Sequence, residues 1–200
     1  MVPTRPPPIQ PPATIHHPQF AVLAALVLLV ALGLRLASWH AALGHDVRAD
    51  ELDYVIPAET LTRTGQYLDT FLTEHRTWTR VPLNALVLAA AFATQPPVPA
   101  GTTVADTALM TPRFAAGNLA LIAVSLALLP LVMWLAAEAF PRRRARTALL
   151  AGGLTAIYPP LIHSAAQQLL SETLFITLMF ATLVTLTRWQ PRRTAWPWLV

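Results

Sequence analysis

Long apolar runs, separated by short polar or arginine-rich segments, dominate the sequence. The first run, residues 20–38, has about the 20 residues that an α-helix needs to cross the hydrocarbon core of a bilayer. Further runs occupy residues 81–94, 114–140, 147–166 and 173–187, and another opens at residue 195. This pattern predicts an all-α, multi-spanning transmembrane helical bundle. Because the sequence stops inside a hydrophobic run, we expect more spans to follow.

The first apolar run and the segment before it predict how the chain begins. The run contains one charge, Arg35, which we expect to snorkel to the membrane interface. A cleaved signal peptide is the alternative interpretation, although its apolar core usually has about 7–15 residues and is shorter than this run. Residues 1–18 are rich in proline and contain Arg5 but no acid, which predicts a disordered cytoplasmic tail.

The distribution of charge predicts the topology. Eight of the ten acidic residues lie between Asp46 and Asp106, whereas arginines without acidic neighbours lie at 142–146 and 188–193. Arginine accumulates in the cytoplasmic loops of membrane proteins. Both arginine clusters face the cytoplasm if the run at 81–94, which is short for a span, is interfacial or re-entrant. We therefore expect spans at about 20–38, 114–140, 147–164 and 171–187, with an outer loop over 39–113.

The composition agrees with a membrane location. Hydrophobic residues make up 54% of the chain, charged residues make up 12%, and the mean hydropathy is +0.49. A soluble domain has about twice that fraction of charged residues. The absence of cysteine excludes disulfides, thiolate catalysis and cysteine-ligated metal sites. Nucleic-acid binding would need a larger basic face with interleaved aromatic residues, so no nucleic-acid partner is expected. A cysteine-free chain whose 14 basic residues are all arginine suits a bacterial plasma membrane.

The outer loop is too rich in apolar residues to be a free tether. One face of a predicted helix carries Tyr54, Ala58 and Leu61. Gly65 is placed to end this helix, and Pro57 interrupts it, so we expect two short pieces or a kink. These pieces, and a second helix at 82–94, are expected to lie along the membrane surface as interfacial helices.

The acidic residues that follow the first span form a motif with a family resemblance. Its elements, in order, are Asp50-Glu51-Leu52-Asp53-Tyr54, Ala58, Leu61, Gly65 and Arg80-Val81-Pro82-Leu83. In these residues the chain resembles the GT-C glycosyltransferases that use polyprenyl-phosphate sugars, especially the protein O-mannosyltransferase-like family 39. Later parts of the family pattern are matched by Arg113, Tyr158-Pro159 and residues 171–175, so the resemblance covers about residues 20–190. The chain departs from the pattern at Val81, where the family often has a proline.

The resemblance implies inverting transfer of a sugar from a polyprenyl-phosphate donor to an acceptor hydroxyl on the outer membrane face. Such a transfer needs one carboxylate to take the proton of the acceptor hydroxyl. Phosphate leaves as a stable anion, so a cation rather than a second carboxyl balances the departing charge. Asp50 fits the general base, and the bidentate guanidinium of Arg80 fits a ligand of the lipid phosphate. Glu51 and Tyr54 are the expected substrate-binding neighbours. The resemblance also implies that later spans complete the donor pocket, so residues 1–200 alone are expected to be inactive.

Each candidate residue has a simpler interpretation. Asp50 and Glu51 are alternatively solvated acids beside a membrane, or they bind a divalent cation together with Asp53. Arg80 alternatively anchors to lipid headgroups, and Tyr54 alternatively packs in the core or at the interface. Two other function classes stay open. A transporter or flippase places ionisable residues near the bilayer midplane beside broken helices, and a membrane scaffold uses the outer acids to bind a partner protein.

Overall fold

The computed structural model describes residues 18–43, 49–67, 82–99 and 107–189. Within these residues the chain is all α-helical, which confirms the predicted fold class at that level. The helices are α1 (Pro18–Ala42), α2 (Ala49–Thr64), α3 (Pro82–Phe92), α4 (Thr107–Ala139), α5 (Arg144–Ile157), α6 (Pro159–Ala166) and α7 (Glu172–Trp189). Most of the predicted tail, Arg80 and the run that opens at residue 195 lie outside the described residues.

Two of these helices are long and apolar enough to cross a membrane. They are α1, with 25 residues, and the Leu109–Ala139 part of α4, with 31 residues. At 1.5 Å per residue they measure about 37 and about 46 Å, against a hydrocarbon core of roughly 30 Å. The span predicted at 20–38 falls within α1, and the one predicted at 114–140 agrees with α4 up to its end at Ala139. In the most apolar stretch of α1 only 11% of the residues are buried inside the protein, so most of its side chains need another apolar environment.

The segment predicted as a third span is broken into two helices. α5 ends before Tyr158 and α6 starts at Pro159, because Pro159 and Pro160 have no N–H to donate to the carbonyls of the preceding turn. Tyr158 is extended at the break, with φ −70° and ψ 111°. α5 has 14 residues and α6 has eight, which differs from the single helix expected at 147–164. α7 has 18 residues and covers the predicted fourth span.

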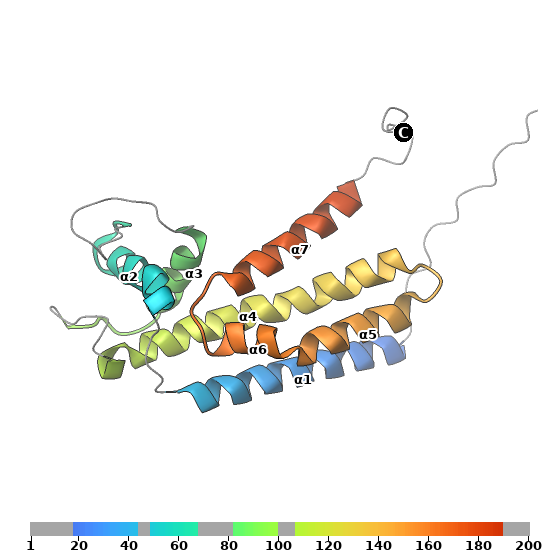
Figure 1. Cartoon of the computed structure of the whole chain (residues 1–200), viewed down its shortest axis with the longest axis horizontal. Helices are drawn as coiled ribbons and strands as arrows, with labels where there is room; N and C mark the ends of the chain where they lie inside the picture. Colours follow the sequence, from blue (N-terminus) through green and yellow to red (C-terminus); the bar gives the residue numbers. More distant parts are fainter. Residues whose placement is uncertain (1–17, 44–48, 68–81, 100–106, 190–200) are drawn as a thin grey trace, which may run out of the picture.

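The long helices are arranged side by side (Figure 1). α4 packs against α5 and α7, and α1 packs against α4, α5 and α6. The start of α1, the end of α4, the start of α5 and the end of α7 all lie at one end of the molecule. Arg144 and Arg146 are in the first turn of α5 and Arg188 is in the last turn of α7, so these three arginines lie at this end. α2 and α3 lie at the opposite end, beside the start of α4.

α2 and α3 form a cap on the first turns of α4. α2 is one helix with Pro57 inside it. Of the two expected alternatives, the division into two pieces is therefore excluded, and a kink at Pro57 stays a prediction. The helix ends at Gly65 as predicted. This residue has a φ of 70°, and its N–H donates to Leu61 O at 2.9 Å. Tyr54 and Ala58 of the predicted apolar face of α2 are buried, and Leu61 is partly buried. They belong to a hydrophobic cluster that also contains Val55 of α2, Ala85, Leu88 and Phe92 of α3, Met110, Phe114 and Leu121 of α4, and Leu169. α3 has 11 residues, too few to cross a bilayer.

Arg35 does not snorkel to an interface, so that prediction is wrong. Its side chain is fully buried, and α1 continues beyond it to Ala42. Arg35 Nε donates to Ser125 Oγ on α4 at 2.8 Å, and Nη1 donates to the carbonyls of Ala31 at 3.1 Å and Ala156 at 3.2 Å. Ala156 O has no helical partner, because the residue four positions later is Pro160. The break after α5 therefore supplies an acceptor that holds the arginine inside the bundle.

Candidate functional site

The predicted site residues of the outer loop lie on α2, but they face different surroundings. Asp50 and Glu51 are both in the first turn of α2, where the helix dipole favours negative charge. The Asp50 side chain is exposed, whereas Glu51 is 5% exposed and Tyr54 is 7% exposed. Arg80 lies outside the described residues. The structure therefore brings an exposed carboxylate and two buried polar groups to one end of the same helix.

Glu51 and Tyr54 contact the segment that joins α6 to α7. Glu51 Oε1 accepts a hydrogen bond from the backbone N–H of Leu169 at 2.9 Å. Tyr54 Oη lies 2.9 Å from Ser171 Oγ, so the two hydroxyls share a hydrogen bond. Glu51 and Tyr54 thus hold the α6–α7 segment, which is more than a hundred residues away in the sequence, against the first turns of α2, where Asp50 lies. Substrate contact by Glu51 or Tyr54 stays a prediction.

Asn84 on α3 completes this attachment. Its Nδ2 donates to the carbonyl of Leu169 at 3.0 Å, so both backbone polar groups of Leu169 are bound by side chains of the cap. Leu169 is itself 3% exposed, and its side chain packs against Gly117 of α4, where an added Cβ would stand 3.0 Å from Leu169 Cδ2. The α6–α7 segment, α2, α3 and α4 therefore form one packed unit behind Asp50.

A buried ionic network fixes the other end of α2. Glu59 accepts hydrogen bonds from Arg63, one turn later on α2, and from Arg113 on α4. Glu59 is 4% exposed and Arg113 is 3% exposed, and Arg113 also donates to Pro96 O at 3.3 Å. A carboxylate and a guanidinium at this burial need each other, because either charge alone would lose its hydration without compensation. The network ties α2 to α4 and to the segment after α3.

On the rigid support of the cap, Asp50 is an exposed carboxylate and Asp53 is half-buried. In the described part of the chain, no group of three or more histidine, aspartate or glutamate side chains is arranged to hold a metal ion. The divalent-cation interpretation of Asp50, Glu51 and Asp53 thus gains no cluster of ligands from these residues. An exposed carboxylate at a helix start retains the capacity to accept a proton from a hydroxyl that docks beside it.

Glu59, Arg63 and Asn84, which help to build this region, were not among the predicted site residues, whereas Arg113 matches a part of the family pattern. Glu59 and Arg63 are spaced four residues apart on a helix, a pattern that predicts an ion pair. The partners Asn84 and Arg113 have no such local signal, because their contacts join positions 54 and 85 residues apart. Arg35 did carry a signal, since an ionisable residue within a predicted span suggests a functional or structural role in the bundle.

A second polar region lies around Arg35, between α1 and α4. Arg35 Nη2, Trp39 Nε1 and Asn118 Oδ1 are buried and have no hydrogen-bond partner among the described residues. Trp39 is one helical turn beyond Arg35 on α1, and Asn118 is about two turns before Ser125 on α4, toward the end with the cap. Trp39 Nε1 and Asn118 Oδ1, which have no partner among the described residues, therefore lie between the buried Arg35 and the end of the bundle that carries the cap.

Comparison with known proteins identifies no relative: no family model, curated protein or solved structure matches the chain.

Proposed function

We propose that this protein is an integral membrane glycosyltransferase that transfers a sugar, with inversion, from a polyprenyl-phosphate donor to an acceptor hydroxyl. The proposal starts from the motif that resembles the GT-C family. The observation that carries it further is the position of Asp50, an exposed carboxylate on a packed helical cap at the end of the molecule opposite Arg144, Arg146 and Arg188.

The membrane location is supported by α1 and α4, which are long and apolar enough to cross a bilayer. Arg35 attaches α1 to Ser125 and Ala156, and this attachment favours a retained span over a cleaved signal peptide. Because arginine accumulates on the cytoplasmic side, we place the end with these three arginines in the cytoplasm and the cap outside. A bacterial plasma membrane, with the N-terminus cytoplasmic, is the proposed location.

In the proposed reaction, Asp50 takes the proton of the acceptor hydroxyl as the oxygen attacks the anomeric carbon of the sugar. The bond from that carbon to the lipid phosphate breaks, and the phosphate leaves as an anion. Arg80, two residues before the start of α3, is the proposed ligand of this anion. Glu51 and Tyr54 support the reaction by fixing the first turns of α2 against the α6–α7 segment.

The test is to replace Asp50 with Asn in the intact protein, in native membranes, and to measure transfer of radiolabelled sugar from a polyprenyl-phosphate donor. We expect a loss of about 10²–10⁴-fold, the usual contribution of a general base. Glu138→Gln is the matched control, because Glu138 is an exposed acid near the end of α4, outside the family motif, and its change should leave transfer intact. Membrane insertion should be normal in both variants. Undiminished transfer by the Asp50 variant would exclude this residue as the base.

A transporter or flippase is the second candidate function, and one observation favours it. Arg35 is buried within the bundle and contacts Ala156 beside the break between α5 and α6, the combination of ionisable residue and broken helix that transporters use. If this candidate is correct, replacing Arg35 with Gln abolishes movement of a lipid or solute across vesicle membranes, whereas Asp50→Asn has no effect on it.

A further inference from the structure

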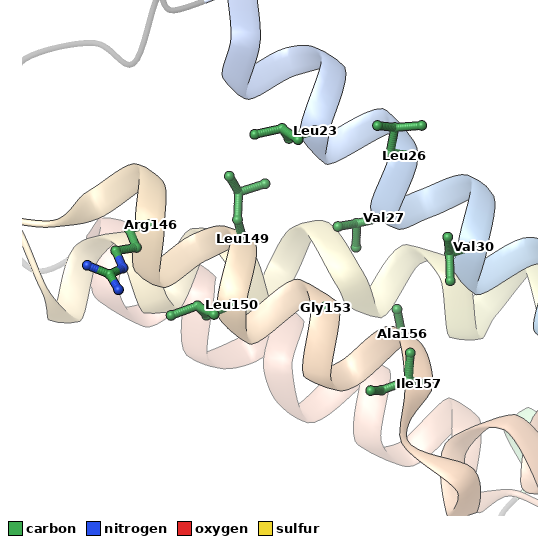
Figure 2. Close-up of a pocket in the computed structure, with 10 residues that line it drawn as sticks. All are labelled: Leu23, Leu26, Val27, Val30, Arg146, Leu149, Leu150, Gly153, Ala156 and Ile157. Carbon is green, nitrogen blue, oxygen red and sulfur yellow. The ribbon is translucent and has the colours of Figure 1, made fainter.

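An apolar groove lies along the outside of the bundle, between α1 and α5, away from the cap (Figure 2). Its volume is about 420 Å³, which is within the range of small-molecule binding sites. The residues that line it are Leu23, Leu26, Val27 and Val30 from α1, and Arg146, Leu149, Leu150, Gly153, Ala156 and Ile157 from α5.

The groove is open and its floor is unfilled. A Cβ added at Gly153 would meet no heavy atom within 4 Å, so this glycine leaves space on the groove side of α5. Its neighbour Gly152 differs, because a Cβ there would stand 2.7 Å from Met133 Cγ, and it packs α5 onto α4. The leucines at the rim are exposed, with 51% for Leu26 and 58% for Leu150. These side chains require an apolar occupant or an apolar solvent.

Charge is confined to one end of the groove. Arg146 is the only charged residue of the lining, and it lies in the first turn of α5 at the arginine-rich end of the bundle. Within the described residues Arg146 has no hydrogen bond or ion pair, whereas its neighbour Arg144 is paired with Glu138 at 3.4 Å. From Arg146 to Ile157 the groove follows eleven residues of helix, or about 16 Å.

We propose that this groove binds an anionic phospholipid, with one acyl chain along α1 and α5 and the phosphate at Arg146. The groove is apolar along its length and has one cationic side chain, Arg146, at one end, so it complements a phospholipid that carries its negative charge at one end. Arg146 is exposed in the first turn of α5, at the end that we place in the cytoplasm, so its guanidinium lies where a lipid phosphate is found. The inference rests on the proposed membrane location and is independent of glycosyl transfer, because the groove is remote from Asp50.

The test uses the full chain reconstituted in phosphatidylcholine vesicles that contain a trace of photoactivatable lipid. The probe is phosphatidylglycerol with a diazirine in one acyl chain, and the comparison probe is phosphatidylcholine with the same chain. Cross-linked residues are located by mass spectrometry. We expect phosphatidylglycerol to label the groove residues at least about fivefold more than phosphatidylcholine does, as one arginine–headgroup contact predicts.

Two variants and one control separate the groove from the general lipid surface. Arg146→Gln should remove the preference for phosphatidylglycerol, and Gly153→Phe should fill the floor and suppress labelling by both probes. Gly33→Phe is the control, since Gly33 is an exposed glycine of α1 that also has no heavy atom within 4 Å of an added Cβ and does not line the groove. Labelling should be unchanged in this variant.

Three results would overturn the inference: equal labelling by both lipids in the unaltered chain, undiminished labelling after Gly153→Phe, or cross-links that join two copies of the chain through the groove. Release of the chain from vesicles by alkaline carbonate would contradict the membrane location and this inference together. If the intact protein transfers no sugar but the groove is labelled as expected, the result contradicts the proposed enzyme activity alone and agrees with the lipid site.

Discussion

The hydrogen bond between Glu51 and Leu169 predicts that this carboxylate stabilises the fold. Glu51→Ala removes the acceptor and leaves the Leu169 N–H without its 2.9 Å partner at a residue that is 3% exposed. A hydrogen bond to a charged group contributes about 1.5–3 kcal/mol. We therefore expect Glu51→Ala to lower the free energy of unfolding by about 2 kcal/mol. Glu51→Gln should lower it by about half as much, because an amide oxygen accepts the same bond without the charge.

The neighbouring contact from Asn84 makes this prediction sharper. Asn84 Nδ2 binds the carbonyl of the same residue, Leu169, at 3.0 Å. Two side chains that hold one residue are coupled, so the double variant Glu51→Ala, Asn84→Ala should lose less stability than the sum of the single variants. The expected coupling is about 0.5–3 kcal/mol. If the losses of unfolding free energy in the two single variants add up to the loss in the double variant, then Glu51 and Asn84 do not act together on Leu169.

The unfolding free energies are measured by titrating the protein from mild detergent into sodium dodecyl sulfate and following tryptophan fluorescence. Glu51→Ala with unchanged stability would refute the structural role of this carboxylate. Sugar transfer is the second measurement, because it separates support from substrate contact. If Glu51→Gln folds with nearly full stability but transfers no sugar, then Glu51 contacts the substrate as the family resemblance implies. If activity follows stability across the variants, its role is to position α2.

Two further predictions concern packing and buried charge, and the same titration measures both. Gly152→Ala should destabilise the protein by about 1–3 kcal/mol, because the added Cβ would lie 2.7 Å from Met133 Cγ. Gly153→Ala should be neutral or stabilising by up to about 1 kcal/mol, because an added Cβ there meets no heavy atom within 4 Å. Equal effects of the two substitutions on stability would contradict the packing of α5 on α4. Arg113→Met leaves the buried Glu59 with Arg63 alone and should cost about 3–5 kcal/mol, and adding Glu59→Leu should recover most of that loss. A single Arg113 variant with unchanged stability would refute the ionic attachment.

The parts of the fold that local sequence determines were predicted well. The buried face of α2 and its end at Gly65 follow from helical periodicity and from the conformational freedom of glycine, and both are confirmed. The short helix at 82–94 is observed as α3, Pro82–Phe92. The break at Tyr158 was missed even though Pro159 and Pro160 are plain in the sequence. A hydropathy run measures apolarity alone, and it continues across a backbone break.

The candidate site was predicted less completely, because adjacent residues of a helix face different directions. Asp50 and Glu51 differ by one residue, about 100° around the helix axis, and this rotation takes one carboxylate into solvent and the other into the protein. No local pattern decides which of two neighbouring acids is buried. The deciding partner is the N–H of Leu169, 118 residues away in the chain. A contact of that kind is visible only when the long helices are packed.

Arg35 shows how two unfavourable features of the apolar bundle compensate each other. The prolines after α5 leave the Ala156 carbonyl without a helical donor, and a buried arginine needs acceptors that leucine and valine do not provide. The 3.2 Å bond from Nη1 to Ala156 O satisfies the carbonyl and one nitrogen of the guanidinium, and it places positive charge at the negative end of the α5 dipole. Nη2 has no partner among the described residues, so the helix break explains only part of the reason why a charge lies inside the bundle. The buried arginine is therefore weaker support for a transporter than it would be beside an intact helix.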